Sequence, residues 1–198
     1  MQAAEIELKF PVDDVVALRS RANELGLWLE TERTFESNTL YDTPERSLRA
    51  QKQILRIRWY GQQCTVTHKR KPQVGDAGER YKTRIETESV VEDGDAVAEI
   101  FGQLGYLPVF RYEKFRTVWG ADGGGYLVLD ETPIGVWAEL EGSPEWIDAM
   151  LARLGVGADQ CLTDSYGTLF LKWKSESGSP AENMSFVEIE AAVGAAAL

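Results

Sequence analysis

The feature that most constrains this chain is a recurring alternation of charged and apolar residues over short segments. In the first segment, Glu5, Glu7 and Lys9 alternate with apolar residues. Successive side chains of a β-strand point to opposite faces of the sheet, so each such segment predicts a strand with one charged face and one apolar face. The pattern recurs in four later segments, whose charged residues are Arg56 and Arg58; Arg84, Glu86 and Glu88; Lys114 and Arg116; and Glu139 and Glu141.

On a single strand, a charged face is most simply explained by contact with solvent. Five such strands together with amphipathic helices suggest a different arrangement. If the apolar faces pack outward beneath the helices, the charged faces must line the inside of a closed barrel. Buried charges are costly unless they are paired or satisfied by a ligand. A polyanion for the basic groups and a divalent cation for the carboxylates would satisfy them, so phosphate and metal are the natural occupants.

Helices are expected between these strands. Three apolar series of helical period each end at a Leu-Gly pair, where glycine allows the left-handed exit from a helix. Counted from the N-terminal residue to the terminating glycine, the three helices are expected from Asp13 or Asp14 to Gly26, from about Asp95 to Gly105, and from Ser143 to Gly155. A shorter helix is expected from Thr163 or Asp164 to Trp173. Turns are expected at residues 73–78 and 122–125, the second within a hairpin.

The length of 198 residues, 43% of them hydrophobic, suits one domain with a sizeable core. Residues 1–174 are expected to form this domain. From Ser175 to Pro180 the composition turns to serine, glycine and proline, so residues 175–198 are expected to be a flexible tail. The alternative is that Phe186–Ile189 adds an edge strand.

Composition narrows the classes of function. The 21 Lys+Arg and 32 Asp+Glu residues give a net charge of −11, which argues against a nucleic-acid partner because phosphate-backbone binding needs a basic face. The distant Cys64 and Cys161 and the single His68 argue against a disulfide framework and a zinc site. His68 falls on the apolar face of its strand and is expected to be structural. A metal would be held mainly by carboxylates, which favours Mg²⁺ or Mn²⁺.

Membrane association and secretion are not expected. No apolar run approaches the ~20 residues of a membrane helix. Charged residues begin at Glu5 with no apolar segment before them, so no secretory signal is visible. These observations predict a cytoplasmic protein with no membrane partner.

Several short motifs follow one another along the chain. The first is Glu5-Ile6-Glu7-Leu8-Lys9, and the whole set spans residues 4–173. The later members, in order, are Tyr41-Asp42-Thr43-Pro44, Leu55-Arg56-Ile57-Arg58, Lys69, Arg84 with Glu86, Lys114-Phe115-Arg116, Asp130, Glu139-Leu140-Glu141-Gly142 and Ser165-Tyr166. This ordered set resembles the CYTH superfamily, the triphosphate tunnel metalloenzymes. The family signature is ExExK, and its name joins bacterial class IV adenylate cyclase and thiamine triphosphatase.

The resemblance implies an α+β fold, in which an eight-stranded antiparallel β-barrel with helices packed outside holds a triphosphate and Mg²⁺ or Mn²⁺. The residues that it implies for phosphate binding are Lys9, Arg56, Arg58, Lys69, Lys114 and Arg116. Those implied for the metal are Glu5, Glu7, Asp130, Glu139 and Glu141. The implied catalytic residues are Glu5, Glu7 and Lys69, with Arg84 and Glu86 on the same wall. Lys69 falls on the same face of its strand as Thr65 and Thr67, which favours it as the lysine that lines the tunnel. Lys71 is the alternative.

The implied activity is metal-dependent hydrolysis of inorganic triphosphate, a nucleoside triphosphate or thiamine triphosphate. The alternative is a class IV adenylate cyclase, which the cyclase-like stretch Leu104-Gly105-Tyr106-Leu107-Pro108 favours. The thiamine triphosphatase branch has two tyrosines before Asp-Thr, whereas this chain has Leu40 at the first of those positions. A third hypothesis is a noncatalytic module that binds polyphosphate or nucleotide. The oligomeric state is left open, with a homodimer as one outcome.

Overall fold

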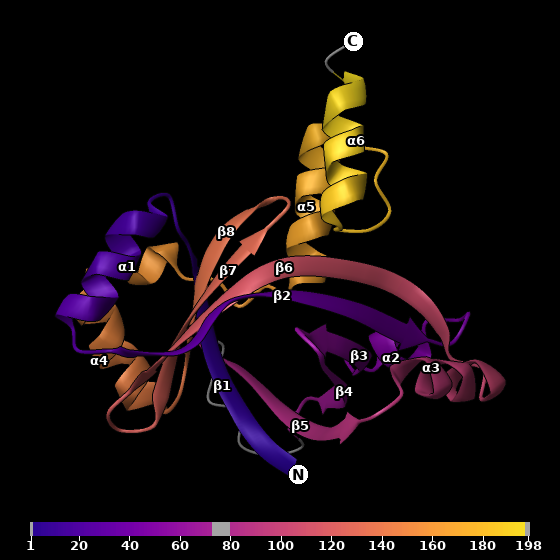
Figure 1. Cartoon of the computed structure of the whole chain (residues 1–198), viewed down its shortest axis with the longest axis horizontal. Coiled ribbons are helices and arrows are strands. Elements are labelled where there is room, and N and C mark those ends of the chain that lie inside the picture. The colour runs from indigo at the N-terminus through magenta and orange to yellow at the C-terminus, as the bar shows by residue number, and fades with distance from the viewer. Residues whose placement is uncertain (1, 73–79, 197–198) are drawn as a thin grey trace.

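The computed structural model describes residues 2–72 and 80–196, and in this part of the chain eight strands close into one barrel (Figure 1). Every neighbouring pair is antiparallel, in the order β1-β5-β4-β3-β2-β6-β7-β8. The strands are β1 (Gln2–Pro11), β2 (Trp28–Asp42), β3 (Ile54–Tyr60), β4 (Gln63–Arg70), β5 (Lys82–Val91), β6 (Leu107–Ala121), β7 (Gly125–Thr132) and β8 (Gly135–Glu141). The predicted closed antiparallel barrel is therefore confirmed. The turn expected at residues 73–78 lies outside the described residues.

The four helices expected from the sequence form and begin close to the expected residues, and the described part of the chain adds two helices and a 3-10 turn that were not expected. They are α1 (Val15–Glu24), α2 (Ser47–Ala50), α3 (Gly94–Gln103), α4 (Pro144–Leu154), a 3-10 turn (Ala158–Gln160), α5 (Tyr166–Ser177) and α6 (Phe186–Ala196). Asp14 caps α1 and Ser143 caps α4, each accepting a bond from an N–H three residues ahead. Helix α5 starts later than expected because Ser165 is its cap, with Oγ accepting from Thr168 N.

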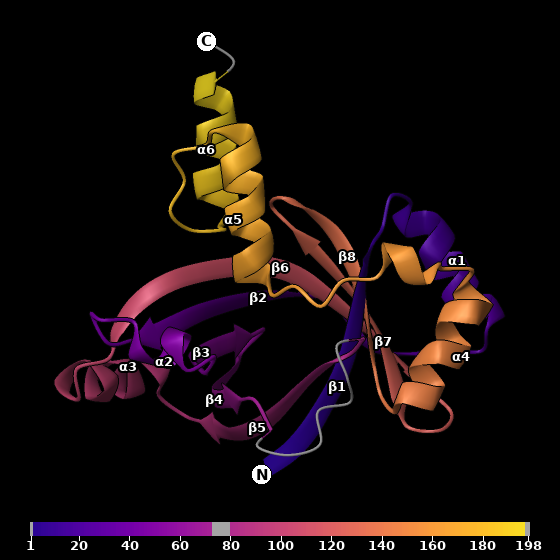
Figure 2. The same cartoon turned by 180° about the vertical axis from the view of Figure 1, so that it is seen from behind.

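The main apolar core lies outside the barrel wall, beneath two helices. Leu8 of β1, Leu127 of β7 and Leu140 of β8 pack in one buried cluster with Ile147 and Met150 of α4. Helix α1 lies beside α4 on this side of the barrel, whereas α2 and α3 lie at the opposite end (Figures 1 and 2). Because alternate residues of a strand face opposite ways, outward leucines turn their charged neighbours toward the barrel interior.

Strand register then brings charged residues from distant segments side by side. Strand β1 crosses from β5 to β8 along its length, so its acids and lysine meet partners on both. The cross-strand pairs are Glu5 with Arg84, Glu7 with Glu141, and Lys9 with Glu139. Residues paired in this way have neighbouring side chains on one face of the sheet. The register therefore concentrates acids and bases at one level of the barrel.

A flexible tail was expected from residue 175 onward, whereas the described part of this segment is largely helical and packs against the rest of the chain. Helix α5 continues to Ser177, and α6 stands beside it (Figure 2). Met184 is fully buried in a cluster with Tyr112 of β6 and Phe170 of α5. Its backbone also extends the sheet, because Met184 N donates to the Arg111 carbonyl at 3.0 Å. Residues 186–189, the alternative edge strand, are helical instead. Local composition gave no sign of the apolar surface on β6 and α5 that holds this segment.

Replacing Met184 by alanine is expected to lower the free energy of unfolding by about 2–5 kcal/mol, because it empties a buried site that neighbouring groups refill only in part. Val187→Ala is the matched control, since Val187 is 79% exposed and its loss should cost at most about 0.5 kcal/mol. Urea unfolding followed by circular dichroism measures both. Equal stability of the two variants would mean that the C-terminal segment does not pack on the barrel.

Candidate active site in the barrel

A cavity of about 270 Å³ opens inside the barrel, and its lining is mainly charged. Eight basic and six acidic side chains line it. The basic ones are Lys9, Arg56, Arg58, Lys69, Lys82, Arg84, Lys114 and Arg116, and the acidic ones are Glu5, Glu7, Glu86, Glu88, Glu139 and Glu141. Every residue predicted for phosphate binding or catalysis is in this set. Of the two candidate lysines, Lys69 lines the cavity, whereas Lys71 is exposed.

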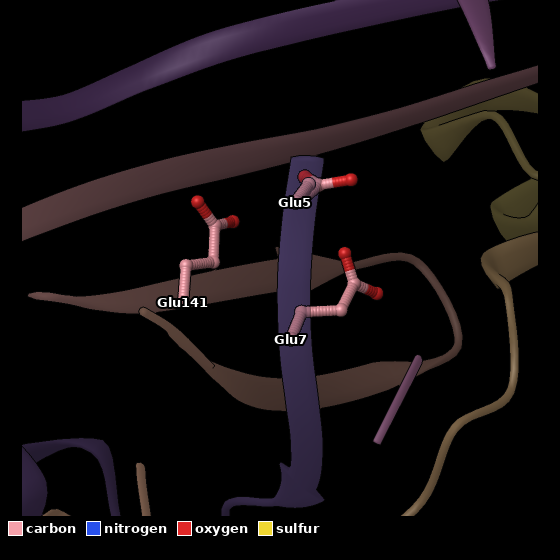
Figure 3. A group of neighbouring side chains, drawn as sticks. All are labelled: Glu5, Glu7 and Glu141. Atoms are coloured by element: carbon pink, nitrogen blue, oxygen red, sulfur yellow. The ribbon is translucent and has the colours of Figure 1, made fainter. Parts of the chain in front are cut away.

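Three of the predicted metal residues form one cluster. Glu5 and Glu7 lie two residues apart on β1, and Glu141 joins them from β8 (Figure 3). One carboxylate oxygen from each lies within 4.8 Å of the others. Burial, together with the nearby charge of Glu5, raises the pKa of Glu141 to about 7. Arg116 lies 3.8 Å from Glu141 and works against this rise, but burial and the neighbouring acid outweigh it.

The basic partners of the cluster lie on β4 and β5. Burial works to raise the pKa of Glu5, but the Lys69 ammonium, 2.9 Å away, outweighs it, and the pKa lies below its usual value. Lys82 Nζ lies 2.5 Å from a carboxylate oxygen of Glu7. Lys69 also forms an ion pair with Glu86. Two of the three acids in the cluster are thus held by lysines.

The other two predicted metal residues, Asp130 and Glu139, lie outside this cluster. Asp130 is completely buried and does not line the cavity. Its carboxylate accepts bonds from Lys114 at 2.9 Å, from Tyr166 at 2.5 Å and from Arg116 at 2.7 and 2.6 Å. Asp130, predicted as a metal ligand, lies opposite Arg116 in the strand register and is placed here as a counter-ion to the basic residues.

Glu139 lines the cavity, but its carboxylate is also committed to cations. One oxygen forms an ion pair with Lys9, and the other accepts a bond from Arg116 at 2.5 Å. The attraction of Lys9 and Arg116 outweighs the effect of burial and holds the pKa of Glu139 well below its usual range. Glu139 therefore stays ionised and helps to orient two of the basic side chains that line the cavity.

The remaining basic residues are also placed by polar neighbours. Arg58 donates to Glu88 at 3.2 Å, and Arg56 donates to the hydroxyl of Tyr112 at 3.2 Å. Arg84 donates to the carbonyl of Thr83 at 2.8 Å. These contacts fix guanidinium groups along the wall before any ligand enters, which reduces the entropy lost on binding.

Sequence reasoning missed two buried polar residues on β2, Glu36 and Asn38. Burial works to raise the pKa of Glu36, but Lys114 and Arg116 outweigh it and hold the pKa at about 2. Asn38 donates to the Glu36 carboxylate at 2.8 Å. The alternation on this strand is hard to see because the residues between them and after them, Ser37 and Thr39, are polar too.

Lys82 was also missed, although a signal was present. It lies two residues before Arg84 on β5, so extending that alternation toward the N-terminus would have placed it on the charged face. His68, in contrast, behaves as expected for a structural residue. Its Nε2 lies 2.9 Å from Gln53 Oε1, and it is not part of the cavity lining.

The CYTH domain family model matches residues 3–143. The chain belongs to the CYTH family. A protein of Methanocaldococcus jannaschii, named "putative adenylate cyclase", is 26% identical over 172 residues, which are 82% of this chain and 95% of that protein. Among the helices in the described part of the chain, none has the length and apolar character needed to cross a bilayer.

Solved structures of other proteins share the fold of this CYTH protein, among them two that carry cyclase names. One is a "putative adenylate cyclase" of Vibrio parahaemolyticus, with a TM-score of 0.71 and 20% identity, covering 84% of this chain and 97% of that one. The other is a "putative adenylyl cyclase" of Hippeastrum, described as having a dominant triphosphatase activity. It has a TM-score of 0.60 and 18% identity, covering 89% of this chain and 96% of that one. At these identities the likeness is one of fold.

Proposed function

We propose that this CYTH protein is a metal-dependent triphosphatase that hydrolyses inorganic or organic triphosphates inside the barrel. The observation that carries the proposal is the convergence of eight basic side chains and a three-carboxylate cluster on one cavity. Arginine and lysine are the side chains best suited to phosphate oxygens, arginine through paired bonds and lysine as a point charge. A chain of phosphates is a ligand that many basic groups in a narrow barrel can contact together.

The charge balance of the cavity supports a divalent cation as a second ligand. The basic side chains of the lining outnumber its carboxylates by two. A fully ionised triphosphate carries more negative charge than this excess, so the protein alone does not neutralise it. The three oxygen donors of Glu5, Glu7 and Glu141 suit Mg²⁺ or Mn²⁺ and lie close enough to share one ion. A metal ion at these residues would supply Lewis acidity and lower the pKa of a bound water.

The contribution of the chain itself is positioning and electrostatic stabilisation, which is most of what phosphoryl transfer requires. Arg56, Arg58 and Arg116 would bind and align the phosphates, with Lys9, Lys69 and Lys114 contributing ammonium groups. Ion pairs within the cavity hold these groups in place beforehand. Because the donors are fixed before the reaction, little reorganisation is needed as charge develops on the transferred group.

The alternative within this family is a class IV adenylate cyclase, in which the ribose 3′-hydroxyl attacks the α-phosphate of ATP and pyrophosphate leaves. The names of the relatives favour it. The cavity lining favours hydrolysis, because its larger uncharged side chains are few: Leu40, Ile54, Tyr112 and Tyr166 in the part of the chain that the structure describes. Both tyrosine hydroxyls are already bonded, to Arg56 and Asp130. An adenine pocket would need more apolar surface than this.

A substrate panel tests the proposal. The purified full chain is incubated with inorganic triphosphate, ATP or thiamine triphosphate, each with Mg²⁺ or Mn²⁺, and the products are separated by chromatography. We expect orthophosphate to be released and no cyclic AMP to form. Cyclic AMP and pyrophosphate from ATP would establish the cyclase alternative. Tight binding of a triphosphate without turnover under either metal would instead support the hypothesis of a noncatalytic binding module.

A further inference from the structure

The strand register extends the row of the acidic cluster onto two exposed aromatic residues. Glu7 of β1 pairs with Glu141 of β8 (Figure 3), and Glu141 pairs in turn with Tyr126 of β7. Tyr126 pairs with Gly120 of β6, and Gly120 pairs with Trp28 of β2. Residues paired in this way have neighbouring side chains on one face of the sheet. Because Glu7 and Glu141 line the cavity, the two aromatic residues belong to the inward face of the same wall.

Both aromatic side chains lie where the barrel opens to solvent. Trp28 is 49% exposed and Tyr126 is 38% exposed. Deeper along the inward face of β7, Val128 is 1% exposed and Asp130 is completely buried. Neither aromatic residue lines the cavity itself. The two rings therefore belong to the rim of the barrel, next to the part of the cavity that Glu141 lines.

The indole of Trp28 takes the place that a side chain on β6 would fill. A Cβ added at Gly120 would lie 2.6 to 2.7 Å from three atoms of the Trp28 ring, which is closer than a real contact allows. The indole therefore packs on the backbone of β6 and extends toward Tyr126, the partner of Gly120 on the next strand. Glycine at this position gives the indole room to lie next to Tyr126.

Two half-exposed rings beside a charged cavity suit a ligand that has both a charged part and a planar ring. Aromatic side chains stack on the flat faces of nucleobases and other rings. Tyr126 lies one strand spacing, about 4.8 Å, from Glu141. A ring joined to a triphosphate by a short linker can therefore reach the rim while its phosphates occupy the cavity. Inorganic triphosphate has no group that could make this contact.

We propose that Trp28 and Tyr126 form an aromatic subsite at the rim of the barrel, which stacks a planar ring of the substrate. The substrate class is then an organic triphosphate with an aromatic group, either a nucleoside triphosphate or thiamine triphosphate, in preference to inorganic triphosphate. The inference rests on the proposed function, because it takes the phosphates to be bound in the barrel. It narrows a substrate class that the charged lining leaves open.

Alanine substitution of each ring separates recognition of the aromatic group from recognition of the phosphates. With Mg²⁺ in excess, kcat/KM for phosphate release is measured on ATP, thiamine triphosphate and inorganic triphosphate. We expect Trp28→Ala and Tyr126→Ala each to lower kcat/KM at least about fivefold for one or both organic substrates, the scale of one lost stacking contact. The value for inorganic triphosphate should change less than about twofold, because its phosphate contacts are kept. The organic substrate with the larger loss carries the ring that the subsite recognises.

Leu29→Ala is the matched control. Leu29 is 50% exposed, much like its neighbour Trp28, but it pairs with Trp119 and lies on the opposite face of β2. Its loss should therefore leave kcat/KM for all three substrates unchanged.

Nuclear magnetic resonance of the wild-type chain provides a readout that does not depend on the alanine variants. The indole N–H signal of Trp28 is the one that disappears from the spectrum of Trp28→Phe. Without added metal, so that the ligand is not hydrolysed, saturating ATP or thiamine triphosphate is expected to move this signal upfield through the ring current of the stacked group. Inorganic triphosphate should leave it in place. If the alanine variants do not fold, this signal decides.

Two results would overturn the aromatic subsite while leaving the triphosphatase proposal in place. One is a loss of kcat/KM in the alanine variants that is absent, or equal for organic and inorganic triphosphate. The other is a Trp28 signal that neither organic ligand moves. A wild-type chain that hydrolyses none of the three substrates would overturn the proposed function and the subsite with it.

Discussion

Glu7→Gln and Glu141→Gln are each expected to lower kcat for triphosphate hydrolysis by about 10²-fold or more, the scale seen when one preorganised charge-stabilising group is lost. Each change keeps the size of the side chain and removes one anionic oxygen donor from the cluster of Glu5, Glu7 and Glu141. Steady-state kinetics at several Mn²⁺ concentrations measure the effect. The loss should be larger at low Mn²⁺, because the variants bind the metal more weakly.

Glu24→Gln is the matched control for these variants. Glu24 lies at the end of α1, paired with Arg21 on the outside of the barrel, so its loss should leave both rate and metal dependence unchanged. Thermal melts of all three variants show whether the fold is kept. Rates near those of the wild type for both cluster variants, at low as well as high Mn²⁺, would remove this cluster from the reaction.

Asp130→Asn is expected to destabilise the protein by about 3–5 kcal/mol, the cost of breaking a buried ion pair from one side. The carboxylate of Asp130 is completely buried and holds Lys114, Arg116 and Tyr166. Neutralising it leaves two buried cations with one counter-charge fewer. Urea unfolding measures the loss, and Asp122→Asn in the exposed β6–β7 turn is the control, expected within about 0.5 kcal/mol of the wild type.

Metal binding separates this counter-ion role from the role of metal ligand. At a temperature where the Asp130→Asn variant is folded, its dissociation constant for Mn²⁺ should stay within about threefold of the wild-type value, since Asp130 lies outside the acidic cluster. A tenfold weaker constant with little change in stability would restore Asp130 to the metal site.

The barrel and most of the lining could be predicted because they depend on local alternation. In Glu139-Leu140-Glu141, for example, the leucine packs under α4 and the two acids turn inward, as strand parity requires. The alternation along one strand does not give the register between strands that are far apart in the sequence. The division of the acids into a cluster around Glu7 and a counter-ion group around Asp130 follows from that register.

Other features were missed for different physical reasons. Glu36 lies on a strand whose other face carries polar Ser37 and Thr39, so the contrast on which the pattern depends is weak. The burial of Met184 depends on a surface formed by β6 and α5, which only the tertiary structure creates. The serine- and glycine-rich stretch before Met184 predicts a connecting segment. It carries no information about whether the residues after it are folded.

The most direct measurement is a crystal structure of the chain soaked with Mn²⁺ and a slowly hydrolysed triphosphate analogue. The account predicts an anomalous manganese peak bounded by Glu5, Glu7 and Glu141, with the phosphates in the cavity along Arg56, Arg58 and Arg116. Phosphate density on the outer surface of the barrel, or manganese held away from these three carboxylates, would contradict it.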